Sequence, residues 1–381
     1  MNVRLRNNKS ILYLVTTDAY FLSHRLPLAR AARDSGFKVL VATTKTLKSD
    51  SITQEGFTFI PLKKLKRTGQ NPLEDLRALL EIIQIYRGHK PDIVHHVALK
   101  PVLYGSLAAW FTRVPRVINA LTGLGYLFIS TRWTSRFLKS MVMAFFRALF
   151  NRSNHTLILQ NKDDFKKFAE FVRPQNLALI RGSGVDTKHF CPSPKKTNNH
   201  PLKVALVARM LFDKGVQEAV DAVTLLKKHG TPITLLLAGM PDLENPRSIC
   251  EQKLNEWHKN GDAQWIGHQD DVAKLYQTVD VALLPSYREG LPKSLLEAAS
   301  CGLPIIASDV PGCREVVKDG DNGFLVPLTP KGIAEALQKM AEDQALRHRM
   351  GKKSRLMALA EFSKERISEE TLALYSLPNT I

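Results

Sequence analysis

Short apolar runs alternate with segments of helical spacing along the first half of the chain. Brief continuous apolar runs predict buried strands, and apolar positions three and four residues apart predict amphipathic helices. The expected strands are 10–15, 38–42, 92–96 and 116–120, and the expected helices are 24–34, 72–88 and 103–112. Asn71 followed by Pro72 is a typical helix start. This alternation predicts a parallel sheet with helices on both faces.

The same alternation begins again near residue 202. The expected strands are 202–208, 233–238, 263–266, 279–284, 304–307 and 323–326, with helices between them and a helical tail over 331–375. The segment 190–201 holds three prolines and a polar run, as an interdomain linker does. The pattern therefore predicts an α/β protein with two doubly wound domains. We place the first at 1–190, a linker at 191–201, the second at 202–360 and a last helix at 361–381.

Composition supports two globular domains, and the charge distribution separates them. The chain has 381 residues, of which 44% are apolar and 24% are charged. Its net charge of +18 resides in the first half, because residues 1–185 hold 29 Lys and Arg against 11 Asp and Glu. Such a half suits an anionic partner (nucleic acid, phospholipid or a diphosphate-bearing substrate), and a merely solubilising surface is the alternative. The absence of helix-turn-helix, zinc-finger and aromatic RNA-binding motifs disfavours nucleic acid.

Cysteine usage and apolar run lengths indicate a cellular compartment. Cys191, Cys250, Cys301 and Cys313 form no paired motif, which suits a reducing cytosol. The apolar run 11–15 is too short for the core of a signal peptide. No apolar run reaches the roughly 20 residues that a membrane-spanning helix needs. We therefore expect a cytoplasmic protein.

The segment 287–309 places two carboxylates in a loop–helix–strand arrangement. Glu289 lies in a Gly-Leu-Pro turn, and Glu297 follows after seven intervening residues, inside an Ala-rich helical pattern. A helix start offers free backbone N–H groups to an anionic ligand. Carboxylates beside that ligand are suited to accept hydrogen bonds from sugar hydroxyls. Glu297 has apolar neighbours, so a buried position would require a partner, and an exposed helix carboxylate is the alternative.

Two cations follow the first expected strand of the second domain. Arg209 and Lys214 are five positions apart in the loop that precedes the next helix. Such a pair can bind a diphosphate, although two surface cations would have the same pattern. The cations and the glutamates all follow strands of one parallel sheet, whose carboxyl ends share an edge. This common edge favours the diphosphate clamp.

Glu289 and Glu297 in this setting resemble the paired-glutamate motif of the retaining glycosyltransferases of family 4. The resemblance extends over nearly the whole chain and is closest to the branch that builds bacterial surface glycans on a polyprenyl carrier. It implies the GT-B fold, in which two doubly wound Rossmann-like domains face a central cleft. It also implies that the last helix crosses back onto the first domain, which binds the acceptor, while the second domain binds the donor.

The resemblance implies roles for the four charged residues. Arg209 and Lys214 would hold the diphosphate of the donor and offset charge on the leaving nucleotide. Glu289 would face hydroxyls of the transferred sugar, and Glu297 would bind the ribose hydroxyls. Catalysis would then be largely electrostatic, with a donor phosphate oxygen taking the acceptor proton.

The remaining donor contacts are expected in two loops. Backbone groups of Gly290, Leu291 and Pro292 would lie near phosphate or sugar, and the base would bind near Ile266. The resemblance implies a nucleotide-sugar co-substrate, for which we favour a UDP-sugar, and no bound cofactor. The resembled family does not need a metal ion, so no metal is expected.

Three loops of the first domain resemble substrate-contacting loops of the family. The glycines of the third loop would allow close backbone approach to a substrate, whereas the first loop lacks the double glycine that many relatives carry. The candidate contacts are Tyr20 and His24 in the first loop, His95 and Lys100 in the second, and Gly123 and Gly125 in the third.

The second loop departs from the family pattern, because many relatives have His where this chain has Val97. His95, His96 or Lys100 would then supply the missing contact. For the pair His95–His96 core packing is an equal alternative. For His24 the alternative is a helix-start residue that is satisfied locally, and Asp18 is a further candidate in that first loop.

The segment 132–152 has the composition of an interfacial membrane helix. It holds five cations and no acid, which suits anionic lipid. A core helix with a solvated basic face is the alternative, and the cluster 63–67 supports the membrane interpretation. We expect peripheral binding to the inner face of the cytoplasmic membrane. The apolar residues at helical spacing are Trp133, Phe137, Met141, Phe145 and Leu149.

Together these features predict a retaining glycosyltransferase. It would move a sugar, with an N-acetylhexosamine favoured, from a UDP-sugar to a polyprenyl-diphosphate-linked saccharide. Two alternatives remain. One is an epimerase or hydrolase of nucleotide sugars on the same scaffold, and the other is a non-catalytic binder of anionic polymers.

Overall fold

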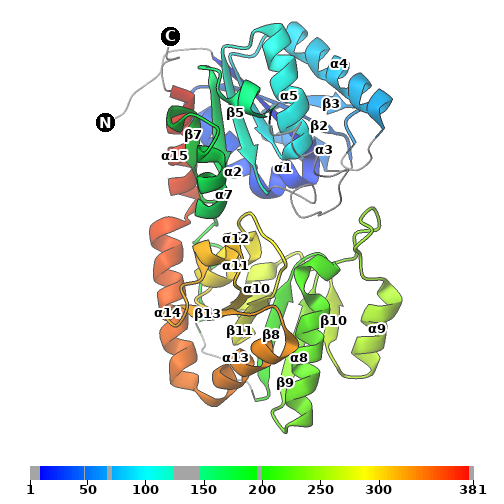
Figure 1. Cartoon of the computed structure of the whole chain (residues 1–381), viewed down its shortest axis with the longest axis vertical. Coiled ribbons are helices and arrows are strands. Elements are labelled where there is room, and N and C mark those ends of the chain that lie inside the picture. Colours follow the sequence, from blue (N-terminus) through cyan, green and yellow to red (C-terminus); the bar gives the residue numbers. More distant parts are fainter. Residues whose placement is uncertain are drawn as a thin grey trace. The chain divides into compact units, whose positions relative to one another are not determined.

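The computed structural model describes residues 9–46, 48–66, 71–123, 144, 146–194 and 200–376. The chain divides into two compact units, one made of Met1–Ser183 with Glu365–Ile381 and the other of Gly184–Lys364 (Figure 1). Each unit contains a parallel sheet with helices, as the alternating pattern predicts. The expected Gly125 and residues 132–143 and 145 of the expected membrane segment 132–152 lie outside the described residues.

The first unit is built on a sheet of seven strands among the described residues, in the order β3-β2-β1-β4-β5-β6-β7. All neighbouring strands are parallel. The order reverses beside β1, which is the doubly wound arrangement. The strands are β1 (Ser10–Thr17), β2 (Lys38–Thr44), β3 (Thr58–Leu62), β4 (Ile93–Val97), β5 (Arg116–Leu121), β6 (His155–Leu159) and β7 (Leu177–Leu179). The helices are α1 (Asp18–His24), α2 (Leu26–Asp34), α3 (Ser49–Gln54), α4 (Pro72–His89), α5 (Leu99–Thr112), α7 (Lys162–Ala169) and α15 (Lys364–Ser376).

Local chemistry explains the boundaries of these elements. The apolar run from Ile11 to Val15 is fully buried, as expected for a central strand covered on both faces. The Asn71 side chain accepts a hydrogen bond from the Leu73 amide at 3.0 Å and begins α4 as predicted. The predicted helix 24–34 is interrupted at Arg25, and its two parts are α1 and α2. Pro27 stands in the first turn of α2, where its missing N–H costs nothing.

The second unit has a sheet of six strands among the described residues, in the order β10-β9-β8-β11-β12-β13. Again all neighbours are parallel and the order reverses beside β8. The strands are β8 (Leu202–Val207), β9 (Ile233–Ala238), β10 (Gln264–Gly267), β11 (Val281–Leu284), β12 (Ile305–Ser308) and β13 (Gly323–Val326). The helices are α8 (Val216–Lys228), α9 (Glu251–Lys259), α10 (Val272–Tyr276), α11 (Lys293–Ser300), α12 (Pro311–Val316), α13 (Pro330–Glu342) and α14 (Gln344–Glu361). Buried apolar clusters cover both faces of the sheet.

The boundary between the units lies earlier than the predicted linker. Residues from Gly184 onward belong to the second unit. Val185 forms a bridge with Ser363, and the Arg355 guanidinium donates to the carbonyls of Thr187 at 3.0 Å and Phe190 at 2.9 Å. Composition does not predict these contacts. Composition alone therefore places the linker at the polar, proline-rich segment 191–201.

The helical tail consists of the three helices α13, α14 and α15, and the last returns to the first unit. In α15 the Tyr375 hydroxyl lies 3.2 Å from the Tyr13 hydroxyl of β1. Both rings belong to a buried cluster of the first unit. The return of the last helix that the family resemblance implied is therefore present. Within the described part of the chain, no helix combines the length and the apolar character needed to cross a bilayer.

Candidate active site

The charged candidates of the second unit follow strands β8 and β11, so they lie at the carboxyl-terminal edge of one parallel sheet. Ligands of doubly wound sheets bind beyond this edge. Arg209 and Lys214 lie between β8 and α8, and Glu289 lies between β11 and α11. Glu297 is in the second turn of α11. The fold thus gathers at one edge the four residues that the sequence analysis selected.

Lys214 and Glu289 form a direct ion pair. The Lys214 ammonium lies 2.5 Å from one Glu289 carboxylate oxygen, and the Ser286 hydroxyl donates to the same oxygen at 2.7 Å. The two side chains are only 21% and 10% exposed, respectively. An ammonium has three N–H donors and a carboxylate has two acceptor oxygens. Each partner therefore keeps hydrogen-bonding capacity for a ligand.

Close backbone packing holds this pair in place. Gly215 has a φ of +69°, and a Cβ there would lie 1.9 Å from the Pro285 carbonyl oxygen. A Cβ at Gly312 would lie 2.5 Å from the Gly290 carbonyl oxygen, and the Gly312 amide donates to the Glu289 carbonyl at 3.2 Å. Only glycine fits at these two positions, so the loops that carry Lys214 and Glu289 are locked against their neighbours.

Glu297 is a buried carboxylate with one ionic partner. Its residue is 7% exposed, and the Lys293 ammonium one turn earlier in α11 lies 3.0 Å from one of its oxygens. Burial raises the pKa of Glu297, and the charge of Lys293 opposes that shift only in part. Among the described residues the other oxygen makes no hydrogen bond, so it can accept one from a ligand hydroxyl.

Arg209 lies apart from this pair in the structure. Its guanidinium binds the carboxylate of Asp242, and its side chain remains 52% exposed. The loop after β8 is tied to the loop after β9, because the Met210 amide donates to the Met240 carbonyl at 3.0 Å. Gly239 has a φ of +141°, and a Cβ there would lie 1.9 Å from the Ala208 carbonyl oxygen. The predicted clamp is thus two separate cations, each with its own carboxylate.

The expected backbone contacts lie at the same edge. Pro292 is buried and precedes the first turn of α11, and Gly290 and Leu291 are half-buried beside it. Ile266 is half-buried at the end of β10, where its carbonyl accepts a hydrogen bond from the Gln269 side chain at 2.7 Å. That carbonyl oxygen has a second lone pair, so it can still accept a hydrogen bond from a base.

Sequence reasoning missed three polar partners at this edge, namely Lys293, Ser286 and Asp242. Lys293 carried a signal, because a Lys four residues before a Glu in a helix is placed to pair with it. Ser286 lies three residues before Glu289 and carried a weaker one. Asp242 carried none, since its contact with Arg209 spans 33 residues.

The expected first loop of the first unit is largely the helix α1, which carries a half-buried aromatic pair and a structural acid. The rings of Tyr20 and His24 stack with their centroids 4.2 Å apart, and the Ser23 hydroxyl lies 2.7 Å from a His24 ring nitrogen. Asp18 is buried, which would raise its pKa, but hydrogen bonds from Thr46 and Ser49 outweigh burial and lower it. Asp18 therefore fixes the loop after β2 and is no longer a candidate substrate contact.

In the second loop, His95 is a core residue and Lys100 is partly accessible. His95 has no exposed surface, and one ring nitrogen lies 2.6 Å from the Tyr375 hydroxyl. The structure thus corrects the expectation that His95 contacts substrate and supports the core-packing alternative. The Lys100 ammonium lies 3.3 Å from the Asp75 carboxylate, and its side chain is 22% exposed. Val97 is buried, and Gly123 is half-buried after β5.

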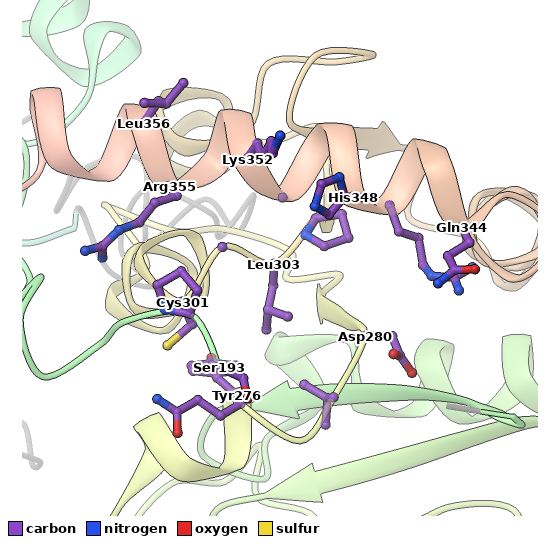
Figure 2. Close-up of a pocket in the computed structure, with 17 residues that line it drawn as sticks. Ser193, Tyr276, Asp280, Cys301, Leu303, Gln344, His348, Lys352, Arg355 and Leu356 are labelled. Carbon is purple, nitrogen blue, oxygen red and sulfur yellow. The ribbon is translucent and has the colours of Figure 1, made fainter. Parts of the chain in front are cut away.

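A cavity of about 420 Å³ lies elsewhere in the second unit. Figure 2 shows its wall formed by α14, with His348, Lys352 and Arg355 facing Cys301 and Leu303. It is lined by Asp280 and Pro304, which precede β11 and β12, so it lies at the amino-terminal edge of the sheet. Arg355 is already bonded to the Ser300 carbonyl at 2.7 Å. This cavity is therefore not the candidate active site.

Comparisons with known families match both halves of the chain. Residues 10–161 match the model of the glycosyl transferase 4-like family, and residues 187–357 match that of the glycosyl transferases group 1. The chain is 27% identical to the N,N'-diacetylbacillosaminyl-diphospho-undecaprenol alpha-1,3-N-acetylgalactosaminyltransferase of Campylobacter jejuni, over 93% of this chain and 97% of that protein. It is 26% identical to the capsular polysaccharide biosynthesis glycosyltransferase CapM of Staphylococcus aureus, over 97% of each chain.

Solved structures show the same fold. Anabaena Alr3699/HepE in complex with UDP and glucose superposes with a TM-score of 0.76 at 19% identity, over 96% of this chain and 99% of that one. WaaG, a glycosyltransferase involved in lipopolysaccharide biosynthesis, superposes with a TM-score of 0.70 at 16% identity, over 94% and 98% of the two chains. With two parallel Rossmann-like sheets, the paired glutamates at the edge of the second and family matches on both halves, the chain is a glycosyltransferase and belongs to family 4, with the GT-B fold.

Proposed function

We propose that this glycosyltransferase moves a sugar from a UDP-sugar to a lipid-diphosphate-linked saccharide, with retention of the anomeric configuration. The observation that carries the proposal is the Lys214–Glu289 ion pair, which lies at the carboxyl-terminal edge of the second sheet and keeps free donors and an acceptor. A diphosphate needs cations, and a sugar needs hydrogen-bond acceptors. One preformed pair offers both at adjacent positions.

The relatives support the donor and acceptor classes. The Campylobacter protein is named for transfer of N-acetylgalactosamine to an undecaprenol diphosphate carrier. A 25% identical relative from Escherichia coli is named for galactose transfer from UDP-galactose to such a carrier. We therefore place the reaction at the cytoplasmic face of the membrane and favour an N-acetylhexosamine as the transferred sugar.

In the proposed reaction, Lys214 neutralises charge that develops on the departing UDP. One donor directed at such charge is worth about 3–4 kcal/mol of transition-state stabilisation. Glu289 keeps the ammonium in position and offers its second oxygen to a hydroxyl of the sugar. The free oxygen of Glu297 accepts a ribose hydroxyl. Consistent with the family resemblance, a donor phosphate oxygen takes the proton of the acceptor hydroxyl, so no side chain has to act as the base.

Arg209 has to exchange Asp242 for the diphosphate of the donor. Its pair with Asp242 is half exposed on the arginine side, and such pairs contribute only about 0–1 kcal/mol. The exchange is therefore inexpensive, and a bidentate arginine–phosphate contact is stronger than the bond it replaces.

Thermal shift with a panel of nucleotides and nucleotide sugars tests the donor site. We expect stabilisation by UDP and by one UDP-sugar, with loss of that stabilisation in Arg209→Ala. Arg366→Ala is the matched control, because Arg366 is 55% exposed and also pairs with a carboxylate. No response of the folded wild type to any nucleotide would contradict the proposal. Product analysis with and without acceptor separates transfer from hydrolysis and epimerisation.

A further inference from the structure

The outward face of α4 carries three exposed leucines, which we call the α4 stripe. Leu73, Leu76 and Leu80 are 66%, 52% and 51% exposed. Their spacing places them on one side of the helix over about two turns. Ala78, Ile82 and Tyr86 occupy the opposite side and are buried in the core of the first unit. In Figure 1, α4 lies on the outside of this unit beside α5.

The acids of α4 do not share this outward face, because each is bound to the rest of the unit. Glu74 pairs with Lys66 at 2.8 Å, and Asp75 pairs with Lys100 at 3.3 Å. Glu81 accepts the backbone amides of Lys63 and Lys64, both at 2.9 Å. This last contact fixes the loop that carries two lysines beside the helix.

The cations around the stripe, in contrast, are left for an external partner. Among the described residues, the side chains of Lys63, Lys64, Arg77 and Arg87 are exposed and have no ionic partner. By helical spacing Arg77 and Arg87 share the face of the leucines. In the described part of the chain, unpaired cations flank this apolar stripe. A bilayer of acidic phospholipid complements such a surface, because its acyl interior is apolar and its headgroups are anionic.

The α4 stripe begins at the edge of the first sheet where substrate is expected. Lys100 in the first turn of α5 contacts Asp75 in the first turn of α4, so these two helix starts are neighbours at the carboxyl-terminal edge. Helix α1, which carries Tyr20 and His24, directly follows β1 at the same edge. A lipid surface against the stripe would therefore lie next to the loops that receive a lipid-linked acceptor.

The described end of the basic segment 132–152 is buried, unlike the α4 stripe. Within 132–152, the described residues Phe146, Leu149 and Phe150 are buried in a core cluster. At that end the structure supports the core-helix alternative, and Leu149 does not face lipid. In the described part of the first unit, the exposed large apolar side chains are the three leucines of α4 and, in the last turn of α5, Trp110 and Phe111.

We propose that α4 rests on an anionic bilayer, with Leu73, Leu76 and Leu80 entering the acyl boundary and Lys63, Lys64 and Arg77 contacting lipid phosphates. This inference rests on the proposed function, because it places the membrane beside a site for a lipid-linked acceptor. It names the surface by which the enzyme reaches that acceptor, which the donor site alone does not specify.

Co-sedimentation with vesicles of phosphatidylglycerol and of phosphatidylcholine tests the inference on the full chain. The first variant is Leu73→Ser/Leu76→Ser/Leu80→Ser, and the matched control is Leu356→Ser/Leu359→Ser on α14, where the leucines are 62% and 45% exposed. We expect wild type and control to bind phosphatidylglycerol vesicles alike, with binding weakened about tenfold or more by the stripe variant. Lys63→Ser/Lys64→Ser should weaken binding about fivefold per cation, at low salt.

Two outcomes would overturn the inference: the stripe variant binding as wild type does, or wild type failing to bind anionic vesicles. If wild type forms a dimer and does not bind vesicles, and the stripe variant is a monomer, the stripe is a contact surface for a second copy of the chain. Transfer to a water-soluble acceptor is measured in parallel. Its absence from wild type would refute the proposed function and leave the vesicle result standing, whereas unchanged transfer by the stripe variant shows that its donor site is intact.

Discussion

Replacing Lys214 by Ala separates what the ion pair contributes to stability from what it contributes to catalysis. The change removes the ammonium that lies 2.5 Å from Glu289 and leaves the carboxylate, which is 10% exposed, with the Ser286 hydroxyl alone. A polar group left without its partner in such surroundings costs about 1–3 kcal/mol. For a unit of this size each kcal/mol lowers Tm by about 2–4 °C. We therefore expect Tm to fall by about 2–12 °C.

The loss of catalytic activity in Lys214→Ala should be larger, in proportion, than its loss of stability. Loss of one donor aimed at developing negative charge lowers the rate by about 10²–10³-fold, so kcat/KM of Lys214→Ala should fall by that factor. The double variant Lys214→Ala/Glu289→Gln removes the unpaired charge as well. It should recover part of the lost Tm, because an amide is cheaper to bury than a carboxylate, while its activity stays as low as that of Lys214→Ala.

Arg209→Ala is the informative comparison for this series. It breaks a pair that is half exposed on the arginine side and worth about 1 kcal/mol or less, so Tm without ligand should fall by at most about 3 °C. Its effect should appear in nucleotide affinity instead. Tm is measured by differential scanning fluorimetry, and kcat/KM by release of UDP. The reasoning is refuted if Lys214→Ala keeps both its Tm and its kcat/KM, or if Arg209→Ala is the less stable of the two.

Three further substitutions test other features. Burial raises the pKa of Glu297 above 4.5, so its ionisation opposes folding as the pH rises through the folded pKa. Near neutral pH the Tm of Glu297→Gln should therefore exceed that of wild type. A higher Tm of this variant that persists below pH 4.5 would contradict this cause. Gly215→Ala should cost about 3 kcal/mol or more in urea unfolding, because its Cβ would lie 1.9 Å from the Pro285 carbonyl oxygen; a neutral effect would mean that this loop can shift. Ala98 has a φ of +77° at the start of α5, so Ala98→Gly should raise the free energy of unfolding by about 1 kcal/mol, and a loss of stability would show that the residue is unstrained.

The period of the apolar residues predicted most of the fold, and its failures have local causes. Continuous apolar runs marked β1, β2, β8, β9 and β11, because a strand buried on both faces must be apolar throughout. The strand β3 (Thr58–Leu62) was missed because it contains Pro61 and alternates in exposure, as an edge strand does. The break at Arg25 was also missed, since the pattern of apolar positions continues through it.

The candidate site could be predicted as a set of residues but not as a set of contacts. Glu289 and Glu297 were found because their separation is local and their context is a recognisable loop and helix. The Lys214–Glu289 pair joins residues 75 positions apart. Which carboxylate Lys214 pairs with depends on how two loops pack. That packing is decided by Gly215 and Gly312, whose missing Cβ atoms let the loops approach. His95 was a candidate substrate contact with core packing as an equal alternative. Only the return of α15 brings the Tyr375 hydroxyl to His95 and decides for core packing.

Under the proposed function, the arrangement at the second sheet lets one site bind a nucleotide-sugar donor and still release UDP. Lys214 is held by Glu289 in a poorly exposed position, so it is already in place before a diphosphate arrives, and its preorganisation costs nothing during the reaction. Arg209 is held by Asp242 in a half-exposed pair of little net strength. A diphosphate can therefore recruit Arg209 on binding, and Asp242 can take it back when UDP leaves. If so, Asp242→Asn should leave Lys214 and Glu289 undisturbed but slow release of UDP, which single-turnover and steady-state measurements separate. An unchanged steady-state rate with unchanged UDP affinity would remove Asp242 from the cycle.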